Sequence, residues 1–358
     1  MKNISVKKLH PGMITAEDVY AFDGKLIVPA GIVLTENIIL KMDSFDVFSV
    51  KIADEQITAS AEPEESSLSY NQKIRMSPEF KQFKKSYESK IEAFRSSFND
   101  LVTHAENVDM NESLSQALEL LVESGNAVSL MDMLRNMRDY DDSTYAHSIN
   151  VALICNIFAG WLHFSEDEKK LATACGLFHD LGKLTIPDEI IKKPGKLTEK
   201  EFEIVKRHPI EGYKILERLN VNQDIMDAAL MHHEKCDGSG YPYGFQSANI
   251  SRYAKLVTIV DIYDAMTSAR VYRQPLNPFD VITEFENYGL QKYDPHFILT
   301  FLENVVNSYI NQRVRLSNGM EGDVIFINPV HLGRPTVKVG SDFIDLSTRK
   351  ELDIEALL

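Results

Sequence analysis

Large apolar residues recur every three or four positions between residues 80 and 101, which is the spacing of one face of a helix. The stripe consists of Phe83, Tyr87, Ile91, Phe94, Phe98 and Leu101. A stripe of this kind must be covered by a packing partner, and the pattern is compatible with two such partners. It packs against the chain's own next domain, or it forms a coiled coil that makes a homodimer through residues 80–101 or joins a signalling partner protein.

Helical spacing of apolar residues continues through residues 112–310, with breaks at glycines and prolines such as Gly125, Gly182 and Pro209. The longest uncharged apolar run, residues 148–164, includes two asparagines and a glycine. It is also shorter than the ~20 apolar residues of a helix that spans a bilayer. We therefore predict a buried core helix here and no insertion into a membrane.

Short β-rich runs with turn signals lie at both ends of the chain. Near the start, Asp23-Gly24 separates two such runs as in a hairpin, and residues 47–52 form a further predicted strand. Between them Thr35 is a candidate cap of a short helix that ends at Met42. The predicted strands near the other end are residues 314–316, 324–327, 336–339 and 343–346.

The predicted fold is mainly α, an all-helical domain with a small α+β domain before it and a short β extension after it. Residues 62–67, rich in glutamate and serine, lack any periodicity and indicate a linker. The predicted parts are a regulatory α+β domain at 1–56, a linker at 57–76, connecting helices at 77–124, a helical domain at 125–310 and a β appendage at 311–358.

Charge and cysteine content narrow the choice of partners and location. The 358 residues include 53 acidic and 38 basic side chains, a net charge of -15, so DNA and RNA are not expected as partners. An anionic substrate must be attracted by a local cluster. The first twelve residues lack the apolar segment of a secretory signal, and the three cysteines have no CxxC spacing. We expect a cytoplasmic protein with reduced thiols.

Six of the ten histidines lie within residues 147–233, and we single out five of them, each at or near the end of a predicted helix. They are His147, His179, His208, His232 and His233. Helix ends of one bundle can meet and build a metal site. His179 is followed by Asp180, and adjacent residues on a helix point about 100° apart. Such a pair can bind two metal ions only if the ions lie side by side.

Another predicted helix carries Asp261 and Asp264 on an otherwise apolar surface, and one of them is expected to face the same cavity. Imidazole and carboxylate ligands without thiolate suit iron, manganese, nickel or zinc in an open site. The candidate ligands are His147, His179, Asp180, His208, His232, His233 and Asp261. With Asp180 bridging two ions, about four of roughly twelve coordination positions stay free for water and substrate oxygens, as phosphodiester hydrolysis requires.

The residues around these candidates resemble the motifs of the HD-GYP family. The matching stretches read FHDLGK at residues 178–183, HP at 208–209, HHE at 232–234, DGSGYP at 237–242 and DIYDAMTSARVYR at 261–273. The resemblance covers roughly residues 125–310, about half the chain, and makes them the HD-GYP catalytic domain. It implies an all-helical fold, a centre of two or three metals, and membership of the HD-domain metal-dependent phosphohydrolases.

The usual substrate of this family is the bacterial second messenger cyclic di-GMP. The resemblance therefore implies a phosphodiesterase that opens cyclic di-GMP to pGpG, and on to GMP, by a water that two metals activate. Mixed cyclic GMP-AMP stays an alternative substrate, because the residues that contact the bases cannot be identified from the sequence. A catalytically silent signalling protein that binds a nucleotide or a partner also stays open, although seven metal-competent side chains argue against it.

The resemblance also assigns roles to individual residues. The seven candidate ligands match the family's ligands, with Asp180 and Lys183 as catalytic residues. Lys183 matches a lysine that contacts the scissile phosphate, and Arg270 and Arg273 match positions that hold phosphate or guanine. Tyr241 either stacks on a guanine or packs inward as part of a structural turn. The proton donor to the leaving group stays open between Asp264 and a metal-bound water.

One position departs from the members of the family that bind three metals. Those members carry a glutamate four residues before the first histidine ligand, and here that position is Ser143. A neutral hydroxyl is a poor replacement for an anionic ligand. The expected cofactors are therefore two divalent ions, iron or manganese. The geometry of the site and the supply of metal determine which of the two is bound.

Overall fold

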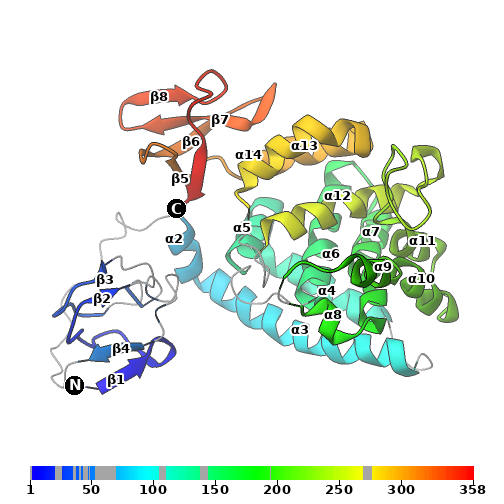
Figure 1. Ribbon diagram of the computed structural model, residues 1–358, viewed down its shortest axis with the longest axis horizontal. Coiled ribbons are helices and arrows are strands. Elements are labelled where there is room, and N and C mark those ends of the chain that lie inside the picture. The colour runs from blue at the N-terminus through cyan, green and yellow to red at the C-terminus, as the bar shows by residue number, and fades with distance from the viewer. Residues whose placement is uncertain are drawn as a thin grey trace. The chain divides into compact units, whose positions relative to one another are not determined.

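The computed structural model (Figure 1) divides the chain into two compact units, Met1–Gln72 and Lys73–Leu358. The residues that it describes are 2–20, 26–34, 38–39, 42, 47, 49–52, 70–104, 110–137, 144–193, 195–268 and 276–358. The unit boundary lies within residues 57–76, which were expected to be a linker throughout. The last part of that segment is instead helical, because helix α2 spans Tyr70–Met76.

The first unit holds two short antiparallel pairs of strands. Strand β1 (Lys2–Ser5) pairs with β4 (Ser49–Ile52), and β2 (Val19–Tyr20) pairs with β3 (Leu26–Val28). The second pair confirms the predicted hairpin. A 3-10 turn, η1 (Val6–Lys8), follows β1. The expected cap at Thr35 lies outside the described residues.

The second unit is built mainly of helices. It begins with α3 (Pro78–His104), α4 (Met110–Ser124), α5 (Ala127–Met137), α6 (Thr144–Trp161) and α7 (Glu166–Phe178). Next come η3 (Leu181–Thr185), α8 (Asp188–Ile191), α9 (Glu199–Val205), α10 (His208–Arg218) and α11 (Gln223–Met231). The last are η4 (Ser247–Asn249), α12 (Arg252–Thr267), α13 (Pro278–Lys292) and α14 (Pro295–Asn307). The expected helical domain is thus confirmed.

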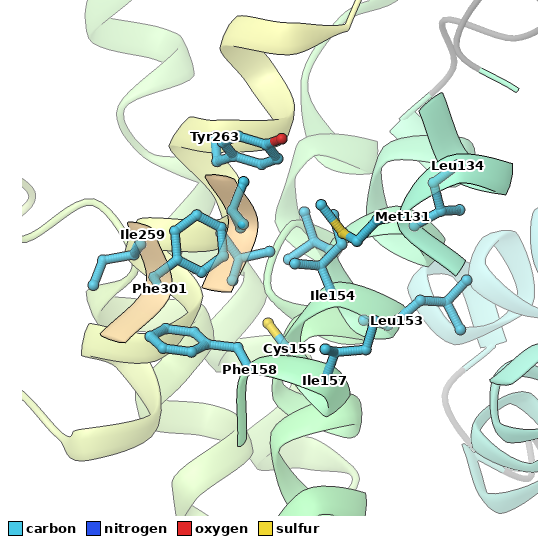
Figure 2. Close-up of a cluster of buried hydrophobic side chains, with 14 of the residues drawn as sticks. Met131, Leu134, Leu153, Ile154, Cys155, Ile157, Phe158, Ile259, Tyr263 and Phe301 are labelled. Atoms are coloured by element: carbon cyan, nitrogen blue, oxygen red, sulfur yellow. The ribbon is translucent and has the colours of Figure 1, made fainter. Parts of the chain in front are cut away.

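Helix α6 is the centre of the core. Almost every residue from Ala146 to Ala159 is buried, and Figure 2 shows Phe158 beside Phe301 of α14 and close to Ile259 of α12. This confirms the predicted buried core helix, which ends at Trp161, before the last three residues of the apolar run at 148–164. Among the described residues, we find no helix with the length and apolar character that crossing a bilayer requires.

The apolar stripe of α3 faces the chain's own domain. All six of its residues are buried, and α3 packs against α4, α5, α6 and η3. The Phe98 ring lies 5.5 Å from the ring of Phe178, which directly precedes the HD pair. The first of the two alternatives is therefore confirmed, and this face is not available for a homodimer through residues 80–101.

An antiparallel sheet in the order β8-β7-β6-β5-β9 ends the chain. Its strands are β5 (Arg313–Leu316), β6 (Glu321–Asn328), β7 (His331–Val339), β8 (Asp342–Asp345) and β9 (Ile354–Leu357). The four predicted strands are present, and β9, which sequence reasoning missed, pairs with β5. Glu286 of α13 accepts the backbone N–H groups of Leu332 and Gly333. These bonds fasten the sheet to the helical part.

Candidate metal centre

The seven candidate ligands converge on one place because helices end there. His147 lies in the first turn of α6, His179 and Asp180 follow α7, His208 begins α10, His232 and His233 follow α11, and Asp261 lies inside α12. Helix ends therefore meet as the sequence predicted. Asp261 is the exception, since it reaches the others from the middle of a buried helix.

A glycine allows the closest approach of these helix ends. A Cβ atom on Gly182 of η3 would overlap the carbonyl oxygen of His208 and the backbone nitrogen of Gly212. Backbone atoms cannot move aside as a flexible side chain can. Only glycine at this position therefore lets the chain after Asp180 cross the first turn of α10.

Two groups of potential metal ligands share Asp180. We call His147, His179 and Asp180 the His147 subsite, and Asp180, His208, His232 and His233 the His208 subsite. In each group the ligand atoms all lie within 4.8 Å of one another. Asp180 Oδ2 is 3.4 Å from His179 Nε2, and Asp180 Oδ1 is 3.3 Å from His208 Nε2. Each carboxylate oxygen thus serves one subsite, as a bridging ligand must.

Asp261 also spans both subsites. Its Oδ1 lies 2.9 Å from His147 Nε2 and its Oδ2 lies 3.7 Å from His233 Nδ1. All seven predicted ligands are therefore brought together, with one carboxylate from η3's start and one from α12 between the two sets of imidazoles.

The donor atoms fit divalent cations. His179 Nε2 and Asp180 Oδ1 are buried without a hydrogen-bond partner among the described residues, and an unsatisfied buried polar atom costs about 1–3 kcal/mol. The Nε2 atoms of His208 and His232 face each other at 3.1 Å. Converging lone pairs of this kind are satisfied by a metal ion between them.

The other ring nitrogens fix these lone pairs in place. The Nδ1–H groups of His179, His208 and His232 donate to the carbonyl oxygens of Gly176, Val205 and Ala229 at 2.7, 2.7 and 2.9 Å. Each acceptor lies three residues earlier in the same segment. A ring whose Nδ1 donates keeps the unprotonated Nε2 that a metal needs.

Burial sets the charge of the imidazoles. It lowers the pKa of His232 to about 4 and lowers that of His233 well below its usual range, with neighbouring histidines adding to the effect for both. Burial also lowers the pKa of His208. These rings are therefore neutral at pH 7 and able to bind a cation without first losing a proton.

The two shared carboxyls are ionised. Burial raises their pKa values, but the Lys183 ammonium and the His179 ring outweigh it and hold the pKa of Asp180 well below its usual range. A hydrogen bond from His147 has the same effect on Asp261 and holds its pKa well below the usual range. Neutral imidazoles combined with anionic carboxylates make a donor set for hard to borderline divalent metals.

His147 differs from the other histidines because carboxylates flank both of its nitrogens. Its Nδ1 donates to Asp264 Oδ2 at 2.8 Å. Burial lowers the pKa of His147, but Asp261 and Asp264 outweigh it and raise the pKa to about 9. Sequence reasoning expected one of these aspartates to face the cavity. Asp261 lies among the ligands, as expected, whereas Asp264 lies behind the ring of His147.

Lys183 lies at the edge of the cluster. Its ammonium group forms an ion pair with Asp180 Oδ2, and its side chain keeps 19% exposure. It is thus close to the shared carboxylate of Asp180 and open to solvent on one side.

Tyr241 lies over the His208 subsite. Its ring is 4.6 Å from the ring of His233 at an angle of 30°, and the loop that carries it is fixed by Glu234. That buried carboxylate accepts the backbone N–H groups of Tyr243, Gly244 and Phe245 at 2.7, 3.1 and 2.9 Å. Sequence reasoning missed Glu234, although it directly follows the two histidines in the HHE motif.

Other predicted features lie outside the described residues. Arg270, Arg273 and Ser143 are all among the positions that the structure does not describe. Their roles stay predictions from the resemblance.

Comparisons with known proteins show similarity over the region that contains this cluster. A family model described as HD domain matches residues 132–297. A cyclic di-GMP phosphodiesterase of Pseudomonas aeruginosa is 35% identical over 212 residues, which cover 59% of this chain and 51% of that protein. A cyclic di-GMP phosphodiesterase of Thermotoga maritima is 35% identical over 178 residues, 49% of this chain and 48% of that protein. The chain thus spans about half the length of these relatives.

Two further similarities concern substrate and fold. The 3'3'-cGAMP-specific phosphodiesterase 1 of Vibrio cholerae is 35% identical over 156 residues, 43% of this chain and 36% of that protein. The structure of an HDG"Y"P protein from Bdellovibrio bacteriovorus has a TM-score of 0.53 at 18% identity, over 85% of this chain and 99% of that one. This last similarity shows the fold alone. Residues 132–297 match the HD domain family model, and the motifs around the ligand cluster resemble those of the HD-GYP family.

Proposed function

We propose that this protein is a metal-dependent phosphodiesterase that hydrolyses cyclic di-GMP. The observation that carries the proposal is a pair of ligand groups that share Asp180, with one carboxylate oxygen directed at each group. Two cations so close together are the usual arrangement for in-line displacement at phosphorus. Relatives 35% identical over this region carry the name cyclic di-GMP phosphodiesterase, which supports the choice of substrate.

The metals, when bound, supply an activated water and neutralise charge on the phosphate. The chain's own residues do the rest. Asp180 and Asp261 hold the two cations together, and Lys183 neutralises the non-bridging phosphate oxygens from the open side of Asp180. Tyr241, whose ring lies 4.6 Å from the ring of His233, stacks on a guanine base. Arg270 and Arg273 contribute positive charge for the second phosphate or base.

Iron or manganese is the metal that we propose for both subsites. Neutral imidazoles with two carboxylates and no thiolate suit either ion. The neutral state of His208 and His232, which burial enforces, allows binding at pH 7 without competition from protons.

The test is turnover by protein purified without oxygen, with its metal content measured by elemental analysis. We expect cyclic di-GMP to be opened to pGpG and then to GMP, with products separated by chromatography. Asp180→Ala should abolish both turnover and metal binding, and His179→Ala should abolish turnover. A fully metallated protein that leaves every cyclic dinucleotide intact would reject the proposal in favour of a silent binding protein.

A second substrate has support of its own. The similarity to a 3'3'-cGAMP-specific phosphodiesterase is as high in identity as the similarity to the cyclic di-GMP enzymes. Competing turnover of equimolar cyclic di-GMP and 3'3'-cGAMP measures the preference directly. Faster consumption of the mixed nucleotide would assign the protein to that class instead.

A further inference from the structure

A chain of buried hydrogen bonds joins the long helix α3 to the ligand His147. The Tyr87 hydroxyl of α3 donates to Asn150 Oδ1 of α6 at 2.6 Å. Asn150 Nδ2 donates to Asp264 Oδ1 of α12 at 3.4 Å. The second oxygen of Asp264 accepts from His147 Nδ1 at 2.8 Å. Three helices are thus connected behind one metal ligand. The bond from Asn150 to Asp264 is the longest and weakest of the three.

The burial of these groups fixes how they point. Tyr87, Asn150 and Asp264 are 2%, 6% and 1% exposed, so water does not replace a lost partner. If the amide of Asn150 were turned over, its oxygen would face the carboxylate oxygen of Asp264 and repel it. The short bond from Tyr87 holds the amide oxygen on the other side and keeps the amide N–H directed at Asp264.

Asp264 in turn controls the ring of His147. Its Oδ1 accepts from Asn150 and from the Ser268 hydroxyl, each at 3.4 Å, which leaves Oδ2 for His147. A carboxylate held in this way sets the tautomer and the orientation of a ligand ring, and such partners typically change metal affinity by about 10–100-fold. The other metal-facing rings that donate through Nδ1 do so to backbone carbonyls near their own helix ends.

We propose that Tyr87 and Asn150 are positioning residues for the metal of the His147 subsite, acting through Asp264. The inference rests on the proposed two-metal centre. Helix α3 lies outside the segment matched as an HD domain. By this proposal α3 supports the metal of the His147 subsite and not the metal of the His208 subsite. Asn150 acts directly on Asp264, whereas Tyr87 acts by holding Asn150.

The test is Mn²⁺ binding to the full-length protein after removal of its metals with a chelator. Stepwise affinities are measured by competition with a chelator of known strength, without any use of turnover. We expect Asn150→Ala to weaken one of two sites by about tenfold or more and to leave the other unchanged. Tyr87→Phe, which keeps the buried ring, should weaken the same site by a smaller factor.

Two comparisons separate positioning from a general loss of stability. Tyr309→Phe removes a buried hydroxyl that bonds to Tyr263 at 2.8 Å, with no bond to a ligand. It should lower the Tm of the metal-free protein and leave both Mn²⁺ affinities unchanged. The double variant of Tyr87 and Asn150 should bind as weakly as Asn150→Ala alone, because the tyrosine acts through the amide.

The outcomes distinguish the inference from the proposed function. Wild-type protein that binds fewer than two ions overturns the two-metal centre, and the inference with it. Wild-type protein that binds two ions while Asn150→Ala and Tyr87→Phe keep both affinities overturns the inference alone. Equal weakening of both sites in either variant also overturns it, since that is the result of a loosened fold.

Discussion

The two metal subsites differ in what holds their ligands. In the His208 subsite, two of the three imidazoles donate Nδ1 to carbonyl oxygens three residues earlier, His208 to the last residue of α9 and His232 to α11, so a nearby helix end positions each of these ligands. In the His147 subsite, the ring of His147 depends on a carboxylate from another helix. His179, in the same subsite, is held by a carbonyl one turn earlier, so the comparison teaches that His147 needs the tertiary fold whereas these other rings follow from local helix ends.

Deletion of α3 is expected to have the largest effect among the tests of this difference. A fragment of residues 110–358 loses the helix that covers Phe178 and supplies Tyr87, whereas a fragment of residues 73–358 keeps both. Each large apolar side chain buried between α3 and its neighbours contributes about 1.5–3 kcal/mol, and whole domains are stable by about 5–15 kcal/mol. We expect only the longer fragment to be folded, as measured by circular dichroism. A shorter fragment with equal Tm would refute this role of α3.

Substitution of Gly182 tests the support of the His208 subsite. Gly182→Ala places a methyl group on the backbone of His208, so we expect a loss of about 1–3 kcal/mol in the free energy of unfolding. We also expect weaker metal binding. Gly160→Ala is the matched control, because only the flexible end of Lys169 is near its Cβ. Denaturant unfolding measures both variants, and equal stability of the two would contradict the close approach.

Removal of one ligand from each subsite tests whether the two halves are separable. His147→Ala and His208→Ala each delete one imidazole that contacts one oxygen of Asp180. We expect each variant to retain about one metal ion per chain where wild type has two, and both to lose hydrolysis, since the proposed chemistry needs both ions. His163→Ala, away from the cluster, serves as the control. Loss of both ions in each variant would mean that the subsites do not bind independently.

Tyr241 is expected to have the smallest effect. It covers only the exposed ligand of the His208 subsite, His233, and does not contact the His147 subsite in any hydrogen bond that the structure describes. Tyr241→Ala should raise KM severalfold more than it lowers kcat, because the stacking energy serves binding of the base. Steady-state kinetics with cyclic di-GMP measures this, and unchanged KM would remove the residue from the substrate site.

Much of the ligand cluster could be predicted from the sequence, because the residues stand next to one another at helix ends. The pairs at 179–180 and 232–233 already indicated two neighbouring ions. The apolar pattern by itself did not distinguish Asp261 from Asp264 as the ligand, since both lie on a helix that is buried nearly all round. Which carboxylate faces a ligand then depends on the rotation of α12 against α6, and the apolar pattern does not determine it.

The fold shows a similar division between local and tertiary information. Periodicity predicted the face of α3 that is buried but left its partner open, because a stripe carries no information on what covers it. The bond from Tyr87 to Asn150 joins positions 63 residues apart, and neither residue stands out in its own segment. Strand β9 is four residues long and was missed because its pairing with β5, rather than its own pattern, makes it a strand.

Metal content with Asp180 intact and removed tests the central claim most directly. Asp180 is the ligand that both subsites share. The control variant is Asp167→Ala, which removes an exposed carboxylate at the start of α7. Elemental analysis of protein purified without oxygen should give two divalent ions per chain for wild type and for Asp167→Ala, and none for Asp180→Ala. Two ions bound to the Asp180→Ala protein, or one ion in the wild type, would contradict a binuclear centre built on this residue.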